Sequence, residues 1–406
     1  MRRGYRPVTP GCQDARVQGR GGTWWVAGGL LFAVAFGTNV PTPLLLVYRT
    51  ELDLAPSTLA AIFGVYALGL APSLLLGGPA SDRYGRVRVL LPASVGVAVA
   101  SLLFLGGASA LWLLFVARFV QGLASGAVFS VGSAWLQDQA GTAGAARAAR
   151  AASIAQTAGF CLGPLVSGLI GAYGPWALTL PYLVHVALLV PAVAAMLAVV
   201  GVGALPAAAG RRGLLPRPGL DAPARRAFVR VVVPTAVCVY AFPAVAVTVL
   251  PLLLPGAAGL VAFTGLLAAL TLGTGTLVQP FAHRLGPRTG PVGAGLGMLG
   301  FAAGVLAAFA ESVIAVGVAG VLLGAGGGLC LNAGLTLVGR LAPAAGRGAA
   351  NGVFYTAAYL GFAAPYLATA FVTVDRLAFP LAVLAVITAV TAAWLTVRSR
   401  DAALGG

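Results

Sequence analysis

The stretch Gly78–Arg88, GPASDRYGRVR, is the most informative part of this sequence. One apolar run ends at Gly78, and another begins directly after Arg88. Between them lie Asp82, three arginines and Gly85, whose backbone can adopt the conformations that a tight turn needs. A short charged turn between two long apolar runs indicates a hairpin of two membrane-spanning helices.

A weaker copy of this hairpin, QPFAHRLGPR, lies at residues 279–288. Arg284 and Gly286 follow Arg83 and Gly85 by the same offset of 201 residues. The repeat indicates that an ancestral set of helices was duplicated.

Composition places the chain in a lipid bilayer. Hydrophobic residues make up 59% of the 406 residues, charged residues 8%, and the mean hydropathy is +0.96. A soluble domain carries about 25% charged residues. The net charge of +16 does not indicate nucleic-acid binding, because the arginines lie in short loops between apolar runs and not on one basic face.

A helix needs about 20 apolar residues to cross a bilayer, and by this criterion the sequence predicts twelve spans. The predicted spans are 24–48, 56–79, 89–108, 110–137, 151–173, 176–202, 229–254, 258–281, 290–310, 312–339, 349–373 and 375–397.

The arginines predict the orientation of these spans. Of the 25 arginines, 22 lie in the tails and loops of one face. The other face keeps Arg49 and Arg376, and Arg118 lies within a span. Because cytoplasmic loops retain basic residues, both termini of this multi-pass protein of the cell membrane are predicted to be cytoplasmic.

The domain organisation follows from the repeat. Pro164 and Pro365, in the fifth and eleventh predicted spans, are also 201 residues apart. The Pro-, Gly- and Arg-rich segment 203–228 is typical of a linker. The predicted parts are a cytoplasmic tail at 1–23, a six-helix bundle at 24–202, a cytoplasmic linker at 203–228, a second six-helix bundle at 229–397 and a cytoplasmic tail at 398–406.

Two further motifs lie inside predicted spans. The fourth span contains Arg118 followed by Gly122, and a charged side chain within a span is a functional candidate because burying it in lipid is costly. The fifth span contains a run of small residues spaced on one helix face, which allows close packing of helix backbones. Its members are Gly159, Gly163, Pro164 and Gly168.

With these three motifs, nearly the whole chain resembles the major facilitator superfamily, and within it the drug:proton antiporter-like exporters. The resemblance implies an all-α membrane protein of twelve helices in two pseudo-repeated six-helix bundles. It also implies a secondary active transporter that exports small, largely apolar molecules by alternating access, with the proton gradient as its energy source and no cofactor. Secondary transporters of this kind bind substrate between the two halves.

The resemblance implies a role for the loop motif as a cytoplasmic latch between conformational states. The residues that match the family pattern are Gly78, Asp82, Arg83, Gly85, Arg86 and Arg88. Asp138 joins them, because a helix from residue 110 brings it to the same face. The alternative is a solvated loop whose arginines only fix the topology.

For Arg118 the resemblance implies a part in proton coupling, whereas an arginine bonded to backbone carbonyls is the alternative. Antiporters of this type often carry a carboxylate in the first helix, and this chain has none there. Asn39 is at matching depth and is the expected partner of Arg118, although an asparagine cannot bind and release a proton. His185, near the middle of the sixth span, is a further candidate, either as a proton carrier or as a hydrogen-bonded packing residue.

The motif of the fifth span is associated with exporters more than importers in this superfamily, and generic small-residue packing is the alternative. Several neutral polar residues within spans are candidates to line a substrate cavity or to bond helices together. They are Gln121, Gln156, Tyr240, Asn332, Asn351, Tyr355 and Tyr359. Since no acidic residue lies in the middle of a predicted span, neutral or anionic cargo is favoured over cations.

Other functions are disfavoured by missing motifs. The sequence contains no HExxH, G-x-S-x-G or GxxxxGK pattern, so it is not expected to be an enzyme or to hydrolyse ATP. The four cysteines show no CxxC spacing, and neither a disulfide nor a metal site is expected. The expected partners are the bilayer and a small substrate, with a monomer as the working unit. Import, uniport and a non-transporting receptor remain alternatives to export.

The two hairpins differ in a way that predicts unequal importance. His283 stands in the second copy where the first has Asp82, so only the first copy keeps the acidic residue of the latch. We expect Asp82→Asn to reduce transport in vesicles far more than His283→Asn. Equal effects of the two substitutions would contradict this asymmetry.

Overall fold

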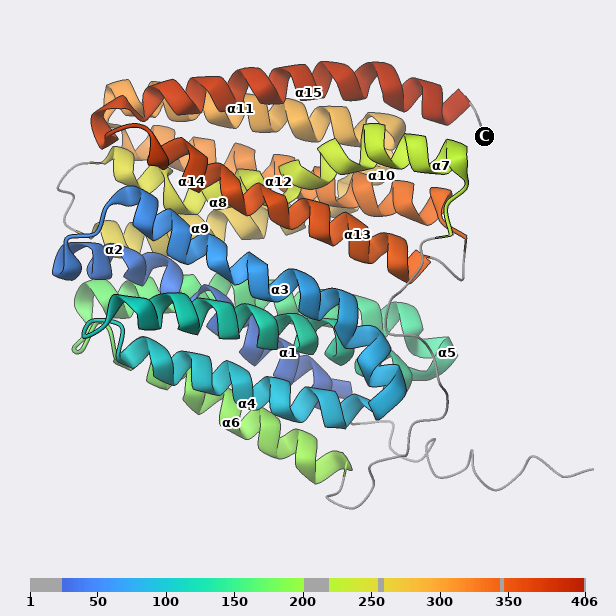
Figure 1. Ribbon diagram of the computed structural model, residues 1–406, viewed down its shortest axis with the longest axis horizontal. Helices are drawn as coiled ribbons and strands as arrows, with labels where there is room; N and C mark the ends of the chain where they lie inside the picture. Colours follow the sequence, from blue (N-terminus) through green and yellow to red (C-terminus); the bar gives the residue numbers. More distant parts are fainter. Residues whose placement is uncertain (1–23, 201–218, 255–258, 344–346, 405–406) are drawn as a thin grey trace, which may run out of the picture.

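A computed structural model describes residues 24–200, 219–254, 259–343 and 347–404. In these ranges the chain is helical, without strands, and its two halves form two groups of helices side by side (Figure 1). The predicted tail at 1–23 and residues 203–218 of the predicted linker lie outside the described residues, as do the side chains of Asp82 and of residues 137–149.

The first group contains six helices, and its longest one holds two crossings. The helices are α1 (Trp24–Asn39), α2 (Pro41–Leu52), α3 (Pro56–Tyr84), α4 (Arg86–Leu105), α5 (Leu111–Tyr173) and α6 (Leu180–Val200). Within α5, Gln156 donates to Ser133 over 3.2 Å and the rings of Phe129 and Phe160 lie 5.4 Å apart. These contacts require the chain to reverse direction, so α5 contains both the fourth and the fifth predicted span.

The second group repeats this arrangement with more interruptions. Its elements are α7 (Ala222–Ala227), η2 (Phe228–Val232), α8 (Val233–Thr248), η3 (Leu250–Leu253), α9 (Leu260–Leu277), η4 (Gln279–Phe281), α10 (Ala282–Leu285), η5 (Gly286–Arg288), α11 (Thr289–Ala310), α12 (Val313–Leu341), α13 (Arg347–Tyr359), η6 (Leu360–Phe362), α14 (Ala363–Ala370), η7 (Val374–Arg376) and α15 (Ala378–Leu404). Helix α7 begins within the predicted linker, where Asp221 caps it by accepting from the backbone N–H of Ala224 over 2.8 Å.

Ten helical segments in the described ranges are long and apolar enough to cross a membrane. One of them, 260–310, joins α9 and α11 through the short helices of the second hairpin, and so contains two predicted spans. The eleventh predicted span is broken into α13, η6 and α14 and is not among the ten. The architecture is therefore consistent with the twelve predicted crossings.

Both hairpins turn at a glycine with positive φ. Gly85 ends α3 and precedes α4 with a φ of 95°, and Gly286 has a φ of 54° at the equivalent place in the second half. Side chains are strained in this region of backbone conformation, so both positions require glycine. The duplicated turn is the local structure on which the repeat depends.

The two groups touch through helices from both halves. Helix α5 packs along α9, where Thr157 and Thr276 share a hydrogen bond of 3.3 Å. Further along the same pair, a Cβ atom on Gly265 would lie 2.3 Å from the carbonyl oxygen of Pro164 and 3.1 Å from Gly168. Backbones can approach this closely only where side chains are absent.

Gly265→Ala should therefore weaken the contact between the halves. Overpacking of a tight interface costs about 1–3 kcal/mol, so the apparent Tm in detergent should fall. Gly295→Ala is the matched control, because a Cβ there meets nothing within 4 Å in the middle of α11. An equal Tm for the two variants would contradict the proposed close contact.

Candidate functional site

A cavity of about 920 Å³ lies between the two halves. Residues of α1, α2, α3 and α5 line it from one half, and residues of α8, α9, α13 and η6 line it from the other. It extends from Thr42 and Val247 toward Pro79 and Ala349, near the membrane face that the arginines predict to be cytoplasmic. A space of this size and position suits a small organic molecule.

Apolar side chains of both halves close the opposite end of the cavity. Val40 and Leu44 from the first half share one buried cluster with Ala244, Val247 and Ala268 from the second. These residues lie toward the face predicted to be extracellular. The cavity is therefore sealed by packing on that side.

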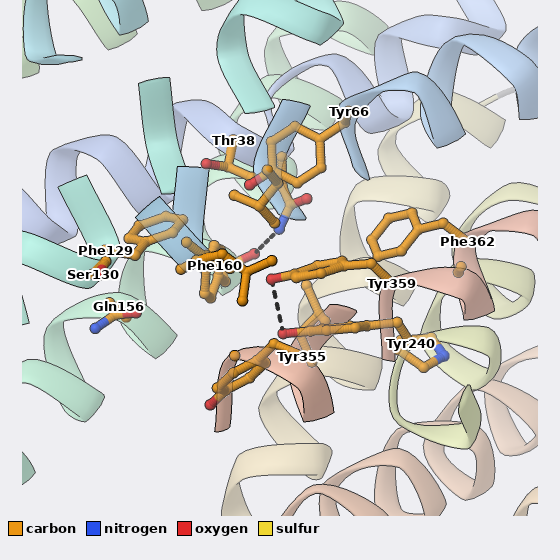
Figure 2. A pocket seen from close by; sticks show the side chains of 18 of the residues that line it. Thr38, Tyr66, Phe129, Ser130, Gln156, Phe160, Tyr240, Tyr355, Tyr359 and Phe362 are labelled. Atoms are coloured by element: carbon orange, nitrogen blue, oxygen red, sulfur yellow. Dashed lines mark hydrogen bonds between the residues drawn. The ribbon is translucent and has the colours of Figure 1, made fainter. Parts of the chain in front are cut away.

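The wall of the second half is aromatic. The rings of Tyr240 and Tyr359 stack with centroids 4.7 Å apart and planes 11° apart, and the Tyr359 hydroxyl donates to the Tyr240 hydroxyl over 3.4 Å (Figure 2). Phe362 lies against both rings, at 5.5 Å from Tyr240 and 5.8 Å from Tyr359. It also meets Phe63 of α3 at 5.3 Å, so the aromatic wall continues across the boundary between the halves.

The wall of the first half is more polar. Thr38, Ser130 and Gln156 line it, and Figure 2 shows Ser130 and Gln156 across the cavity from Tyr240. Asn39 also lines it, and its amide donates to the Phe160 carbonyl over 3.5 Å. Hydroxyl and amide groups of this kind can orient a ligand without adding charge.

Arg118 lies directly behind this wall, with a side chain that is only 1% exposed. Its guanidinium donates to the carbonyl oxygen of Thr38 over 3.0 Å, to Gln121 Oε1 over 2.7 Å and to the carbonyl oxygen of Phe63 over 3.4 Å. It also lies 5.2 Å from the ring centroid of Phe63 and 4.9 Å from that of Tyr66. Neutral acceptors and ring faces therefore hold the cation.

The expected pairing of Arg118 with Asn39 is not among these bonds. The contact to α1 is made one residue earlier, by the backbone of Thr38, while the Asn39 side chain bonds to Phe160. Gln121 also connects Arg118 to α1, because its amide donates to the carbonyl oxygen of Gly37 over 2.8 Å. A part for Arg118 or Asn39 in coupling stays a prediction.

His185 lies outside the cavity wall, in the first half of the molecule. Its side chain is buried, and Nδ1 shares a hydrogen bond of 2.7 Å with the Ser101 hydroxyl, while Nε2 has no hydrogen-bond partner. Its ring is stacked 6.5 Å from Phe36, and it leaves no room for a Cβ on Gly37. The geometry matches the packing alternative, and the proton-carrier role stays a prediction.

The small residues of the fifth predicted span pack against two neighbouring helices. A Cβ on Gly159 would lie 2.5 Å from the Phe32 carbonyl oxygen, and one on Gly163 would lie 2.1 Å from that of Phe36. The first two glycines thus pack against α1. Pro164 and Gly168 face α9 of the other half, as described above, so one motif joins a helix of its own half to the opposite half.

The loop motif is only partly described. Asp82 lies in α3 and Asp138 in α5, but their side chains are outside the described residues. Arg86 donates to the Ser81 hydroxyl, which in turn donates to the carbonyl oxygen of Gly78 over 2.8 Å. These bonds lie within the hairpin, and the latch stays a prediction.

Five of the predicted cavity residues line the cavity, namely Gln156, Tyr240, Asn351, Tyr355 and Tyr359. Gln121 is bonded to Arg118 instead, and among the described residues none of α12, which carries Asn332, lines this space. Further lining residues were not predicted from the sequence, because an aromatic or hydroxyl side chain in an apolar run gives no signal of the direction it faces. These are Thr38, Phe63, Tyr66, Phe129, Ser130, Phe160 and Phe362.

The sequence model of the Major Facilitator Superfamily matches residues 27–365. The chain belongs to the Major Facilitator Superfamily. It is accordingly a multi-pass membrane transporter and not an enzyme, and the repeated hairpins and interfacial cavity are features of that fold.

Curated relatives match over short segments. A class G tetracycline resistance protein of Vibrio anguillarum is 29% identical over 142 residues, which cover 35% of this chain and 36% of that protein. The multidrug resistance protein MdtL of Shigella flexneri is 35% identical over 88 residues, which cover 22% of each chain. The chain thus spans about a third or less of the length of the curated relatives it matches.

Solved structures match over most of the chain. A peptide transporter POT in complex with sulfate superposes with a TM-score of 0.75 at 15% identity, over 92% of this chain and 94% of that one. A POT family transporter in complex with 5-aminolevulinic acid gives a TM-score of 0.77 at 13% identity, over 93% and 96%. At such identities the likeness concerns the fold.

Gln121→Met should destabilise the protein, because it removes an acceptor of the buried guanidinium and a donor to α1. Leaving such groups unpaired costs about 1–3 kcal/mol. Gln279→Met is the matched control, since the Gln279 amide bonds only to the Gly275 carbonyl in its own segment, over 3.2 Å. Thermal unfolding in detergent should show a lower Tm for Gln121→Met, and a fall of the same size in both variants would contradict the role of Gln121.

Proposed function

We propose that the protein exports small, largely apolar molecules, drug-like compounds or metabolites, from the cell by alternating access coupled to proton antiport. The observation that carries this proposal is the cavity between the halves, whose described lining is aromatic, aliphatic, hydroxyl and amide. Such a wall binds an apolar molecule through its rings and orients it through a few hydrogen bonds. A monomer contains the whole cavity.

The packing supports alternating access. The cavity is closed toward the predicted extracellular face by the cluster around Val40 and Leu44, and it reaches Pro79 and Ala349 at the other face. We infer that this is the inward-facing state, with both termini cytoplasmic. Rocking of the halves about the small-residue contact of Gly168 and Gly265 would open the opposite side.

Export is supported by the fifth-span motif and by the names of the tetracycline and multidrug resistance relatives. The alternatives are import and uniport. Among the described residues that line the cavity none is acidic. Arg118 and His185 are the candidates that we propose for proton coupling.

The proposal is tested with purified protein in proteoliposomes under an imposed pH gradient, across dyes, antibiotics and sugars. We expect gradient-driven movement of apolar compounds toward the face opposite the termini, and loss of at least about tenfold in rate for Arg118→Ala, since a guanidinium that ties three helices is removed. Flux that ignores the gradient would contradict antiport, and flux toward the termini would favour import.

A further inference from the structure

The electrostatic character of the cavity comes from a residue that does not line it. Among the described lining residues, none is Asp, Glu, Arg, Lys or His. A described charge in direct contact with the lining residues is that of Arg118, whose guanidinium bonds to the Thr38 backbone and lies against the rings of Phe63 and Tyr66. Those three residues all line the cavity, so the cation is one layer behind its wall.

This positive charge is not neutralised by a described carboxylate. Among the described residues, the acceptors of Arg118 are two carbonyl oxygens and an amide oxygen, and its Nε is buried without a hydrogen-bond partner. A cation held by dipoles alone keeps its full charge. Within a wall of low polarity, its field therefore extends into the adjacent cavity.

The size of this effect follows from Coulomb's law. For unit charges about 8 Å apart at an effective dielectric constant of about 20, the interaction changes an affinity by roughly thirtyfold. An anion in the cavity binds more tightly by this factor, and a cation binds more weakly by the same factor. The affinity of a neutral ligand does not change, so the cavity selects its ligands mainly by their charge.

The aromatic wall of the cavity also extends to the surroundings of Arg118. Tyr240 and Tyr359 stack on each other, Phe362 lies against both, and Phe362 in turn meets Phe63 at 5.3 Å and Tyr66 at 6.3 Å. We call these five rings the aromatic ladder. It begins at Tyr240 of α8 and Tyr359 of α13, and it ends at Phe63 and Tyr66, the two rings that contact Arg118. A planar ring could stack on the ladder with a substituent near the arginine.

We propose that the preferred substrate is a small aromatic monoanion, a planar ring system that carries one carboxylate or phenolate. The ring lies against Tyr240, Tyr359 and Phe362, and the anionic group lies on the side of Thr38 and Tyr66, within the field of Arg118. This inference rests on the proposed function and names its substrate class.

The test is a binding series in which only charge or aromaticity changes. The probes are 2-naphthoate, 2-naphthamide, 2-naphthylmethylammonium and decalin-2-carboxylate, titrated at neutral pH into protein in nanodiscs, with empty nanodiscs subtracted. We expect 2-naphthoate to bind at least about tenfold more tightly than the amide and the ammonium compound, and more tightly than the saturated carboxylate. An ammonium compound that binds as tightly as the carboxylate overturns the proposal.

Variants test which residues produce the preference for an aromatic anion. Arg118→Gln should bring the affinities for 2-naphthoate and 2-naphthamide together, whereas Arg288→Gln, which removes an exposed arginine, should leave their ratio unchanged. Tyr359→Leu should lower the ratio of 2-naphthoate to decalin-2-carboxylate affinity. If Arg118→Gln does not fold, the wild-type charge series and Tyr359→Leu still decide. A preserved charge preference in folded Arg118→Gln overturns the proposal.

Flux measurements separate this inference from the proposed function. If 2-naphthoate binds with the expected preference but is not exported from proteoliposomes, the substrate class holds and export fails. If neutral or cationic dyes are exported while 2-naphthoate does not bind, export holds and the substrate class fails.

Discussion

A buried arginine held by neutral groups is the constraint on which the rest of this structure depends. Removing a guanidinium from water is costly unless its donors are bonded. Arg118 meets much of this requirement with the backbone of Thr38 and Phe63 and the side chain of Gln121, while its Nε has no hydrogen-bond partner. Hydrogen bonds to a charged group contribute about 1.5–3 kcal/mol each. Because the acceptors come from α1, α3 and α5, the charge fixes these helices and builds one wall of the cavity.

The second constraint is the close approach of helices at small residues. In α5, Gly159 and Gly163 bring α1 near, and Gly168 brings α9 of the other half near. At an interface of small residues few side chains interdigitate, so one helix can rotate against the other more easily. The same helix therefore joins the arginine wall to the boundary between the halves. In the proposed alternating-access cycle it would link the shape of the cavity to the conformational state.

The fold could be predicted largely from the sequence, because long apolar runs and charged turns have few structural interpretations. The turn at Gly85 and its copy at Gly286 were expected from spacing alone, and both have positive φ. Details of the site were less accessible. A backbone acceptor such as that of Thr38 exists at every residue and leaves no signal, so Asn39 was predicted in its place. Phe362, in an apolar run, could equally face lipid.

The most direct measurement is a structure of the protein with bound 2-naphthoate that resolves the ring and its carboxylate. We predict that the ring lies against Tyr240 and Tyr359, and that the carboxylate lies on the side of Thr38 and Tyr66, next to the buried arginine. A carboxylate that points away from these two residues toward Gln156, or a ligand bound outside the cavity, would contradict the claim that Arg118 sets what this transporter binds.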